Sequence, residues 1–201
     1  PVVTDNCGNA ITPTGPAIGG SYTTCEGTVT YTWTYTDCEL NAHDWVYTYT
    51  IEYEPFAIAT TDGSATVDCY SDVTTPTPPT VYDNCGVLLT ASTPVITGTY
   101  TSCEGTVIYT FTYTDCELNT DTWAYTYTIE VEDFLVNMPA NGSSTVDCYS
   151  DITTPTPPVV TDNCGNAITP TGPAIGGSYT TCEGTVTYIW TYTDCELNAH
   201  D

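Results

Sequence analysis

The sequence predicts an all-β fold of tandem immunoglobulin-like β-sandwich repeats, with about 78–79 residues per repeat. Three observations lead to this prediction. A cassette beginning Pro1–Gly8 returns in modified form at Pro79–Gly86 and unchanged at Pro158–Gly165. Long stretches alternate threonine with aromatic or branched residues, which is the period of a half-buried strand. Turn-forming residues separate short strand signals throughout, and no segment has a helical period.

The repeat is the strongest feature of the chain. Residues 158–201 match residues 1–44 at every position except one, where Thr32 becomes Ile189. In such arrays each copy is a supersecondary unit, and length comes from adding units. The repetition therefore favours a structural protein, a stalk or filament, over an enzyme.

Two long strands form the centre of each repeat. In Gly27–Asp37 the residues Val, Tyr, Trp and Tyr alternate with threonine without a break. A second alternating run covers Trp45–Glu54, and the intervening Glu39–Asp44 supplies turn chemistry. We expect a long antiparallel hairpin here, and the same pattern predicts it again over Val107–Tyr113 and Trp123–Ile129.

Shorter strands are expected ahead of this hairpin, over Ser64–Cys69, Pro79–Asp83, 87–89 and 94–99. The proline-rich run Thr74–Pro79 cannot form a central strand because proline lacks the backbone donor. We expect it to be an extended surface connection.

The repeat boundaries are placed near Pro55 and Phe134. Residues 1–54 then form a partial repeat without its first strand, residues 55–134 a complete repeat, and residues 135–201 a partial repeat without its last strand.

The charge is one-sided, because 25 acidic residues face no Lys or Arg and the formal charge is −25. Phosphate binding depends on Lys and Arg, so a nucleic-acid partner is excluded, and anionic membrane surfaces are disfavoured. No apolar run approaches the length of a membrane span. The two histidines, His43 and His200, occupy one repeat position that holds no histidine in the second repeat, which argues against a catalytic role. We find no nucleophile–base pair and predict no enzymatic activity.

Eleven cysteines in 201 residues indicate an oxidising, extracellular compartment. The complete repeat holds Cys69, Cys85, Cys103 and Cys116, so three pairings are open. Cys103 and Cys116 flank one strand of about 13 residues that spans roughly 40 Å, too far for a disulfide.

In an immunoglobulin-like sandwich, Cys85 and Cys116 fall at one pole and Cys69 and Cys103 at the other. We therefore predict the disulfides Cys69–Cys103 and Cys85–Cys116. Their equivalents are Cys7–Cys38, Cys148–Cys182 and Cys164–Cys195, which leaves Cys25 unpaired. The alternative, Cys69–Cys116 with Cys85–Cys103, places each bond between poles.

Three blocks recur in order and resemble a known module: Pro-x-Val-x-Asp-Asn-Cys-Gly, then Cys-Glu-Gly-Thr-Val-x-Tyr-x-(Trp/Phe)-Thr-Tyr-Thr-Asp-Cys-x-x-Asn, then Trp-x-Tyr-Thr-Tyr-Thr-Ile-Glu. The whole chain is similar to the HYR-like (hyalin-repeat-like) modules found in tandem in very large surface proteins of gliding bacteria, including adhesins. The resemblance implies an immunoglobulin-like fold, an extracellular setting and a structural or adhesive role, with no catalytic residue. Glu39–Asn41 departs from the Gly-Asn ending of the wider pattern, which affects the loop rather than the fold.

Oxygen-bearing side chains gather at the pole of Cys7 and Cys38, and calcium takes six to eight such ligands. A structural Ca²⁺ is therefore a candidate cofactor. The competing interpretation is that these Asp and Asn residues cap turns. The candidate ligands over the three repeats are Asp5, Asn6, Asp37, Glu39, Asn41, Asp44, Asp83, Asn84, Asp115, Glu117, Asn119, Asp121, Asp162, Asn163, Asp194, Glu196, Asn198 and Asp201.

Threonine is abundant, which suits strands and solubility and also offers O-glycosylation sites beside proline. The candidate O-glycosylation sites are Thr74, Thr75, Thr77, Thr153, Thr154 and Thr156.

Together these features predict a segment of an extracellular stalk, filament or adhesin shaft, stiffened by disulfides. The alternative function is an adhesion module that binds carbohydrate or another surface. The expected partners are neighbouring copies of the repeat, with filament assembly by strand exchange as one form of contact, and glycans.

Overall fold

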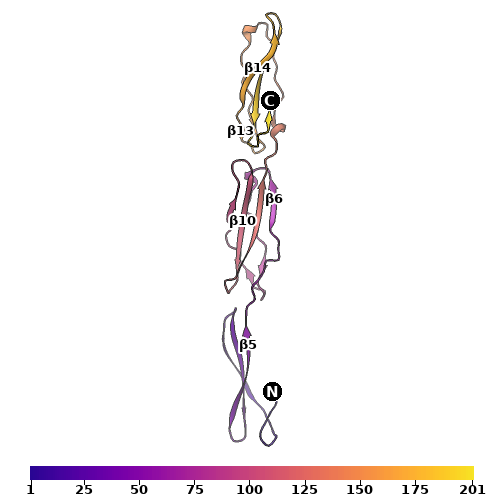
Figure 1. Cartoon of the computed structure of the whole chain (residues 1–201). Coiled ribbons are helices and arrows are strands. Elements are labelled where there is room, and N and C mark those ends of the chain that lie inside the picture. Colours follow the sequence, from indigo (N-terminus) through magenta and orange to yellow (C-terminus); the bar gives the residue numbers. More distant parts are fainter. The chain divides into compact units, whose positions relative to one another are not determined.

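The computed structural model describes all residues, 1–201, and the chain is all-β, as predicted (Figure 1). Its helical segments are three short 3-10 turns, η1 (Tyr70–Asp72), η2 (Phe134–Asn137) and η3 (Tyr149–Asp151). None of them has the length and apolar character needed to cross a membrane. The prediction of tandem β-sandwich repeats is confirmed.

Five strands form the first repeat in two small sheets. A two-stranded sheet pairs β1 with β2, and a three-stranded sheet has the order β3-β4-β5. Their bounds are β1 (Val3–Thr4), β2 (Ala10–Ile11), β3 (Thr14–Tyr22), β4 (Gly27–Thr36) and β5 (Ala42–Ile51).

The second repeat contains the largest sheet, with the order β6-β11-β10-β9, and the pair β7-β8. The bounds are β6 (Gly63–Val67), β7 (Val81–Tyr82), β8 (Leu88–Leu89), β9 (Val95–Gly98), β10 (Gly105–Thr114) and β11 (Thr120–Ile129).

The third repeat has the pair β12-β13 and the sheet β14-β15-β16. The bounds are β12 (Val160–Thr161), β13 (Ala167–Ile168), β14 (Thr171–Tyr179), β15 (Gly184–Thr193) and β16 (Ala199–His200).

The predicted hairpin is confirmed in β4 and β5, which pair antiparallel with Trp33 opposite Trp45. The predicted alternation is confirmed in β10, where the side chains Val107, Tyr109, Phe111 and Tyr113 are buried. The residues between them, Ile108, Thr110 and Thr112, are half-buried, because one face of the sheet meets the core and the other meets solvent.

A segment ahead of the hairpin covers the aromatic residues of β11. Strand β6 pairs parallel with β11, and the indole nitrogen of Trp123 donates to the carbonyl oxygen of Thr61 at 2.9 Å. Gly63 lies so close that a Cβ there would stand 2.3 Å from the Tyr125 ring. Only glycine therefore permits this approach without displacing the ring.

One tyrosine in each central strand ties that strand to the proline that begins the recurring cassette. The Tyr35 hydroxyl donates to the Pro1 carbonyl, Tyr113 to Pro79, and Tyr192 to Pro158. Tyr192 is 2% exposed and packs in a cluster with Phe134 and Val160. Each bond spans 34 residues, and in the second and third repeats it fixes the end of the proline-rich connection to the core.

The compact units do not coincide with the repeats. One unit comprises residues 1–60, 79–93 and 112–122, and the other comprises residues 61–78, 94–111 and 123–201. Each unit contains residues from more than one repeat. Contacts between neighbouring repeats are therefore part of the packing inside each unit. The repeat boundaries 1–54, 55–134 and 135–201 stay a prediction from the sequence.

Candidate functional site at the cystine-linked repeat joints

All three disulfides join one repeat to the next, and the places where they do so are here called joints. Cys25 bonds Cys116 and Cys103 bonds Cys195, with sequence separations of 91 and 92 residues. The third bond, Cys69–Cys164, spans 95 residues. The Cα–Cα distances of 6.1, 5.7 and 5.5 Å, respectively, lie within the range that a disulfide requires.

The predicted pairing inside each repeat is wrong. The structure contains none of the predicted disulfides Cys69–Cys103, Cys85–Cys116, Cys7–Cys38, Cys148–Cys182 and Cys164–Cys195. Cys25, which was expected to be unpaired, is bonded. The free cysteines are instead Cys7, Cys38, Cys85, Cys148 and Cys182.

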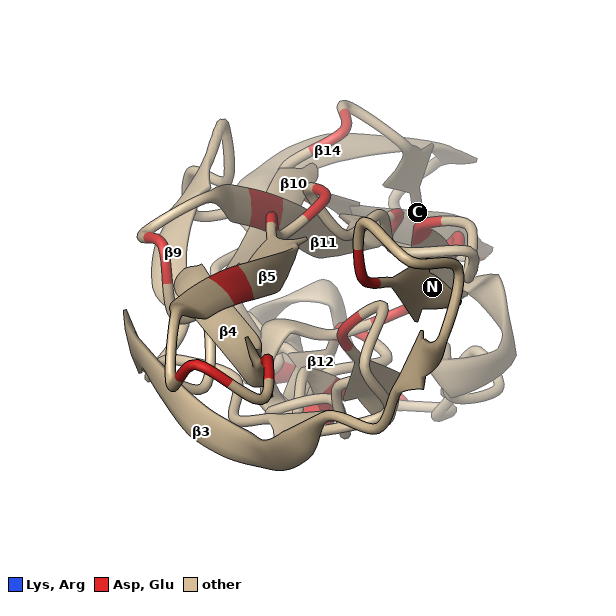
Figure 2. Cartoon of the chain, turned by 90° about the horizontal axis from the view of Figure 1, so that it is seen from below, with Lys and Arg blue, Asp and Glu red and all other residues tan.

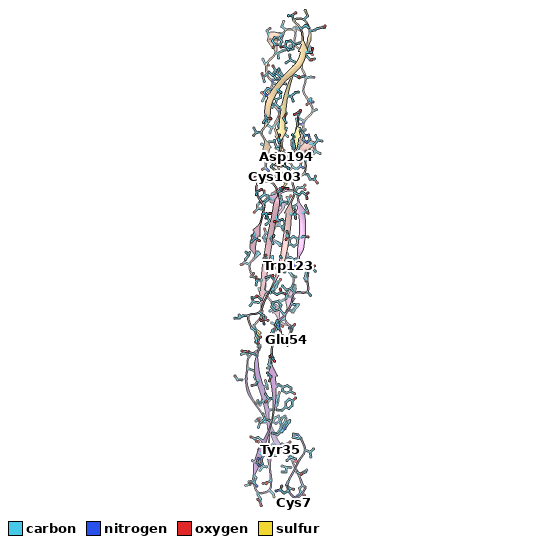
Figure 3. The ribbon with its side chains drawn as sticks, in the orientation of Figure 1. Cys7, Tyr35, Glu54, Cys103, Trp123 and Asp194 are labelled. Carbon is cyan, nitrogen blue, oxygen red and sulfur yellow. A yellow bond between two sulfur atoms is a disulfide. The ribbon has the colours of Figure 1, made fainter.

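The prediction was wrong about which cysteine bonds to which, and not about where Cys69 and Cys103 lie. Cys69 and Cys103 line the same small depression (Figure 3 labels Cys103). Cys164 and Cys195 of the following repeat line it as well, and Cys69 and Cys103 are each bonded to one of these two neighbours from the third repeat. Grouping cysteines by pole was sound, but a pole in an array also borders the next repeat.

Two of the disulfides connect the central strands end to end. Cys103 precedes β10 and Cys116 follows it. The bond from Cys116 leads to Cys25, just before β4, and the bond from Cys103 leads to Cys195, just after β15. We call the path through β15, β10 and β4 the strand line. It crosses the three repeats covalently while using only one extended strand from each.

The third disulfide connects the proline-rich connections in the same way. Cys69 and Cys85 flank residues 70–84, and Cys148 and Cys164 flank residues 149–163. The Cys69–Cys164 bond joins these two segments into what we call the connection line. The strand line and the connection line together contain ten of the eleven cysteines, and Cys7 occupies the same repeat position as Cys85 and Cys164.

Asparagine side chains hold the linkers between repeats. The Asn84 amide donates to the carbonyl oxygens of Glu54 and Pro55 at 2.7 and 3.1 Å. The equivalent Asn163 amide donates to those of Glu132 and Asp133 at 3.0 and 3.4 Å. Both were predicted as calcium ligands, and the structure uses them to fix the entry into the following repeat. The signal available in the sequence was that this asparagine recurs in every copy. The sequence does not show that the linker between repeats passes beside it.

Apolar and charged contacts complete the second linker. Phe134 is fully buried, and its ring meets the His200 ring edge-on at 4.9 Å. His200 Nε2 lies 2.7 Å from Asp133 Oδ1. The hydrogen bond with His200 holds the pKa of Asp133 below its usual value. His43, at the same repeat position, is exposed.

The predicted calcium ligands lie mostly in a recurring turn. In each turn one aspartate accepts hydrogen bonds from backbone N–H groups two and four residues ahead. In all copies but one, an asparagine side chain also donates to its second oxygen, as Asn9 does to Asp5 and Asn41 to Asp37. These side-chain bonds hold the pKa of Asp5 and of Asp37 below the usual value. The remaining turns are those of Asp83, Asp115 with Asn119, Asp162 with Asn166, and Asp194 with Asn198.

The other candidate ligands are used locally or are exposed. Asp44 and Asp201 accept from the hydroxyls of Thr34 and Thr191, both at 2.6 Å, and Asp121 accepts from the Ile58 backbone N–H at 2.9 Å. Asn6, Glu39 and Glu117 are exposed, and Glu196 is half-buried. No group of three acidic, His or Cys side chains is arranged to hold a metal ion. These contacts match the turn-capping interpretation, and calcium binding stays a prediction.

The six threonines predicted as O-glycosylation sites are all exposed: Thr74, Thr75, Thr77, Thr153, Thr154 and Thr156. Thr74 also lies 3.4 Å from the Tyr127 hydroxyl. Exposure permits modification, and the modification itself stays a prediction.

Figure 2 shows acidic residues in many separate segments and no Lys or Arg anywhere.

Comparison with protein families gives one match that covers most of the chain. The model of the HYR-like domain with 4 cysteines matches residues 1–51, 57–129 and 136–201. No curated protein and no solved structure matches the chain. HYR-like repeats are non-catalytic modules, and together with the disulfides they indicate an extracellular, disulfide-stabilised repeat protein. The chain belongs to the family of HYR-like domains with four cysteines, of which it contains three tandem matches.

Proposed function

We propose that this chain is a load-bearing segment of an extracellular stalk, the shaft of a cell-surface adhesin or filament. The observation that carries the proposal is the strand line, in which disulfides join the ends of strands that are already extended. A protein that must transmit tension gains from such a path, because it leaves little slack to be drawn out.

The effect on extensibility follows from the connectivity. Between Pro1 and Asp201 the shortest covalent route runs to Cys25, crosses to Cys116, returns along β10 to Cys103 and crosses to Cys195. This route contains about 43 residue steps, so its full extension is about 150 Å at roughly 3.3 Å per residue. Without disulfides the same ends separate by about 660 Å. The cystines therefore limit the maximum length about fourfold.

The strand segments on this route add almost no reserve length. A β-strand already rises about 3.3 Å per residue, close to the limit of the chain. Each inter-repeat bond is covalent and tolerates forces that separate packed sheets. Load applied to the array thus passes through backbone and cystine, while the sandwiches around them protect the strands.

Single-molecule stretching between the two termini tests the proposal. We expect a contour length near 150 Å in the oxidised chain and near 660 Å after reduction. The double variant Cys103→Ser/Cys195→Ser opens one link and gives an intermediate length. The matched control replaces the five free cysteines with serine and leaves the oxidised length unchanged. Equal contour lengths with and without reductant contradict the proposal.

The setting and partners of the shaft are part of the proposal. We infer a cell-surface location, with neighbouring repeats of the same kind as the direct partners. O-linked sugars on the exposed threonines of the proline-rich connections are expected to protect such a shaft. Intact-mass measurement on native material tests this, and a mass equal to the bare polypeptide contradicts it.

Carbohydrate binding is the second candidate function. On β5 the side chains Trp45, Tyr47 and Tyr49 are 38%, 46% and 54% exposed, and they form a row. The equivalent Trp123 and Tyr127 are buried because β6 pairs with β11, and β5 has no such neighbour within residues 1–201, so the row by itself does not mark a sugar site. Specific binding of the chain on a glycan array supports this function, and a silent array leaves the shaft alone.

A further inference from the structure

Five cysteines have free thiols, and all five are exposed: Cys7, Cys38, Cys85, Cys148 and Cys182. Each occupies a repeat position whose other copy forms a disulfide in this same chain. Their distribution over the repeats is therefore informative in a way that a single exposed thiol is not.

The bonded cysteines follow one rule. With the complete repeat as reference, its four cysteines in chain order are Cys69, Cys85, Cys103 and Cys116. The first cysteine of a repeat bonds the second of the following repeat, as in Cys69–Cys164. The third bonds the fourth of the following repeat, as in Cys25–Cys116 and Cys103–Cys195.

The same rule accounts for every free thiol. Cys148 and Cys182 are the first and third cysteines of the third repeat, so the rule pairs them with a second and a fourth cysteine of a copy joined after it. Cys7 and Cys38 are a second and a fourth cysteine, which the rule pairs with a first and a third cysteine of a copy joined before them, and it pairs Cys85 with a first cysteine ahead of Cys7. The five free thiols are thus the open positions of the strand line and the connection line.

The backbone geometry at the free cysteines supports the same assignment, and it does not depend on the order of the cysteines in the sequence. Cys148 caps η3 with φ −128° and ψ 148°, and the bonded Cys69 caps η1 with φ −127° and ψ 147°. The backbone N–H of Cys182 donates to Thr180 Oγ1 at 3.2 Å, and that of the bonded Cys25 donates to Thr23 Oγ1 at 3.1 Å.

The N-terminal open positions match their bonded copy as well. The N–H groups of Cys7 and Cys85 donate to the Asp carboxylate two residues before them at 2.9 Å, as does that of the bonded Cys164. Four of the five free cysteines, all except Cys38, therefore share a local backbone feature with their bonded copies.

We propose that these five cysteines are inter-repeat disulfide sites, and that their partners are cysteines of adjoining copies of this repeat. In each bond two thiols lose two protons and two electrons and form one S–S bond. The electrons reduce a small-molecule disulfide to two thiols, and thiol–disulfide exchange completes the step.

A fusion tests the proposal while keeping the whole chain. One further repeat, a copy of residues 45–123, is added after Asp201, because Asp201 corresponds to Asp44. The fusion is oxidised with glutathione disulfide, alkylated and mapped by mass spectrometry after cleavage at Glu. Trypsin is unsuitable because the chain has no Lys or Arg.

We expect Cys148 to bond the added copy of Cys85, and Cys182 to bond the added copy of Cys116. Cys148 and Cys182 then escape alkylation, although both are alkylated in the original chain. As matched control, the fusion with serine at those two added cysteines leaves Cys148 and Cys182 alkylated.

Two results overturn the proposal. One is a bond between Cys148 and Cys182, or between either of them and a cysteine of its own repeat. The other is full alkylation of both in the unaltered fusion. Neither result bears on the load-bearing role, because the stretching experiment depends only on the disulfides present in the 201-residue chain.

Discussion

Cys103, just before β10, is bonded to Cys195, just after β15, so the beginning of one central strand is joined covalently to the end of the next repeat's central strand. The disulfide therefore joins the start of the earlier strand, β10, to the end of the later strand, β15, and not the end of the earlier strand to the start of the later one. The first two repeats are connected through the linker and one cystine, and the second and third repeats through the linker and two cystines.

Loss of this bond is expected to destabilise the fold. The variant Cys103→Ser/Cys195→Ser opens a loop of 92 residues, and removal of a native disulfide typically costs about 2–4 kcal/mol. We expect a lower melting temperature by calorimetry under non-reducing conditions. Cys148→Ser/Cys182→Ser is the control in the 201-residue chain, since both thiols are free, and it should melt like the parent. Equal losses in the two variants would show that serine substitution, not bond loss, is responsible.

The linker contact of Asn84 provides a second prediction. Asn84→Ala removes two hydrogen bonds to the linker carbonyl oxygens of Glu54 and Pro55, each worth about 0.5–1.5 kcal/mol net. We expect a loss of about 1–3 kcal/mol in unfolding free energy by denaturant titration, and faster amide exchange in residues 52–60. Asn6→Ala is the matched control, because Asn6 has the same sequence context, is exposed and donates no such bond. Similar effects from both substitutions contradict the assigned role.

The hairpins show how much the sequence carries by itself. Strict alternation over Gly105–Thr114 specifies both the strand and its buried row, because the side-chain period of a strand is two. Strand β6 was expected from its branched residues, but its parallel pairing with β11 depends on residues that are far apart in the chain. The proline-rich run formed no strand, as the missing backbone donors require.

The disulfide pairing could not be predicted from the sequence. Four cysteines per repeat can form disulfides within the repeat or with cysteines of a neighbouring repeat, and the sequence does not distinguish these two arrangements. Cys69 and Cys103 do lie near each other, yet their partners come from the next repeat. The outcome depends on how one repeat meets another, which no single repeat encodes. Asn84 was assigned to calcium for the same reason, because the linker that it binds is invisible in the local pattern.

Acid titration should reveal the turn aspartates. The Asn41 side chain, together with backbone N–H groups, holds the pKa of Asp37 below its ordinary value of 3.8. A depressed folded-state pKa contributes stability that is fully present above 3.8 and is lost as the pH falls through the lower, folded value. Asn41→Ala returns the Asp37 pKa toward 3.8. We expect the variant to be less stable than the parent at pH 7, and the difference to shrink below pH 3.8 in denaturant titrations.

The control for this titration is again Asn6→Ala, which leaves the Asp37 turn intact and should follow the parent at every pH. A stability difference between parent and Asn41→Ala that stays constant from pH 7 to pH 2 contradicts the linkage. Such a result would assign the effect of Asn41 to packing of the turn and not to the ionised carboxylate.

Calcium removal provides the last prediction. The Asp37 carboxylate already accepts bonds from the N–H groups of Glu39 and Asn41 and from the Asn41 amide, so three of its roughly four acceptor positions are used. A cation bound through both oxygens would compete with these donors. The turn-capping interpretation therefore predicts the same melting temperature in Ca²⁺ and in chelator, whereas the calcium prediction requires a higher melting temperature in Ca²⁺. The comparison must be made at equal ionic strength, because a chain of charge −25 gains stability from screening by any salt. A rise specific to Ca²⁺, with saturable binding by calorimetry, would instead restore the aspartate-rich turns as a metal site.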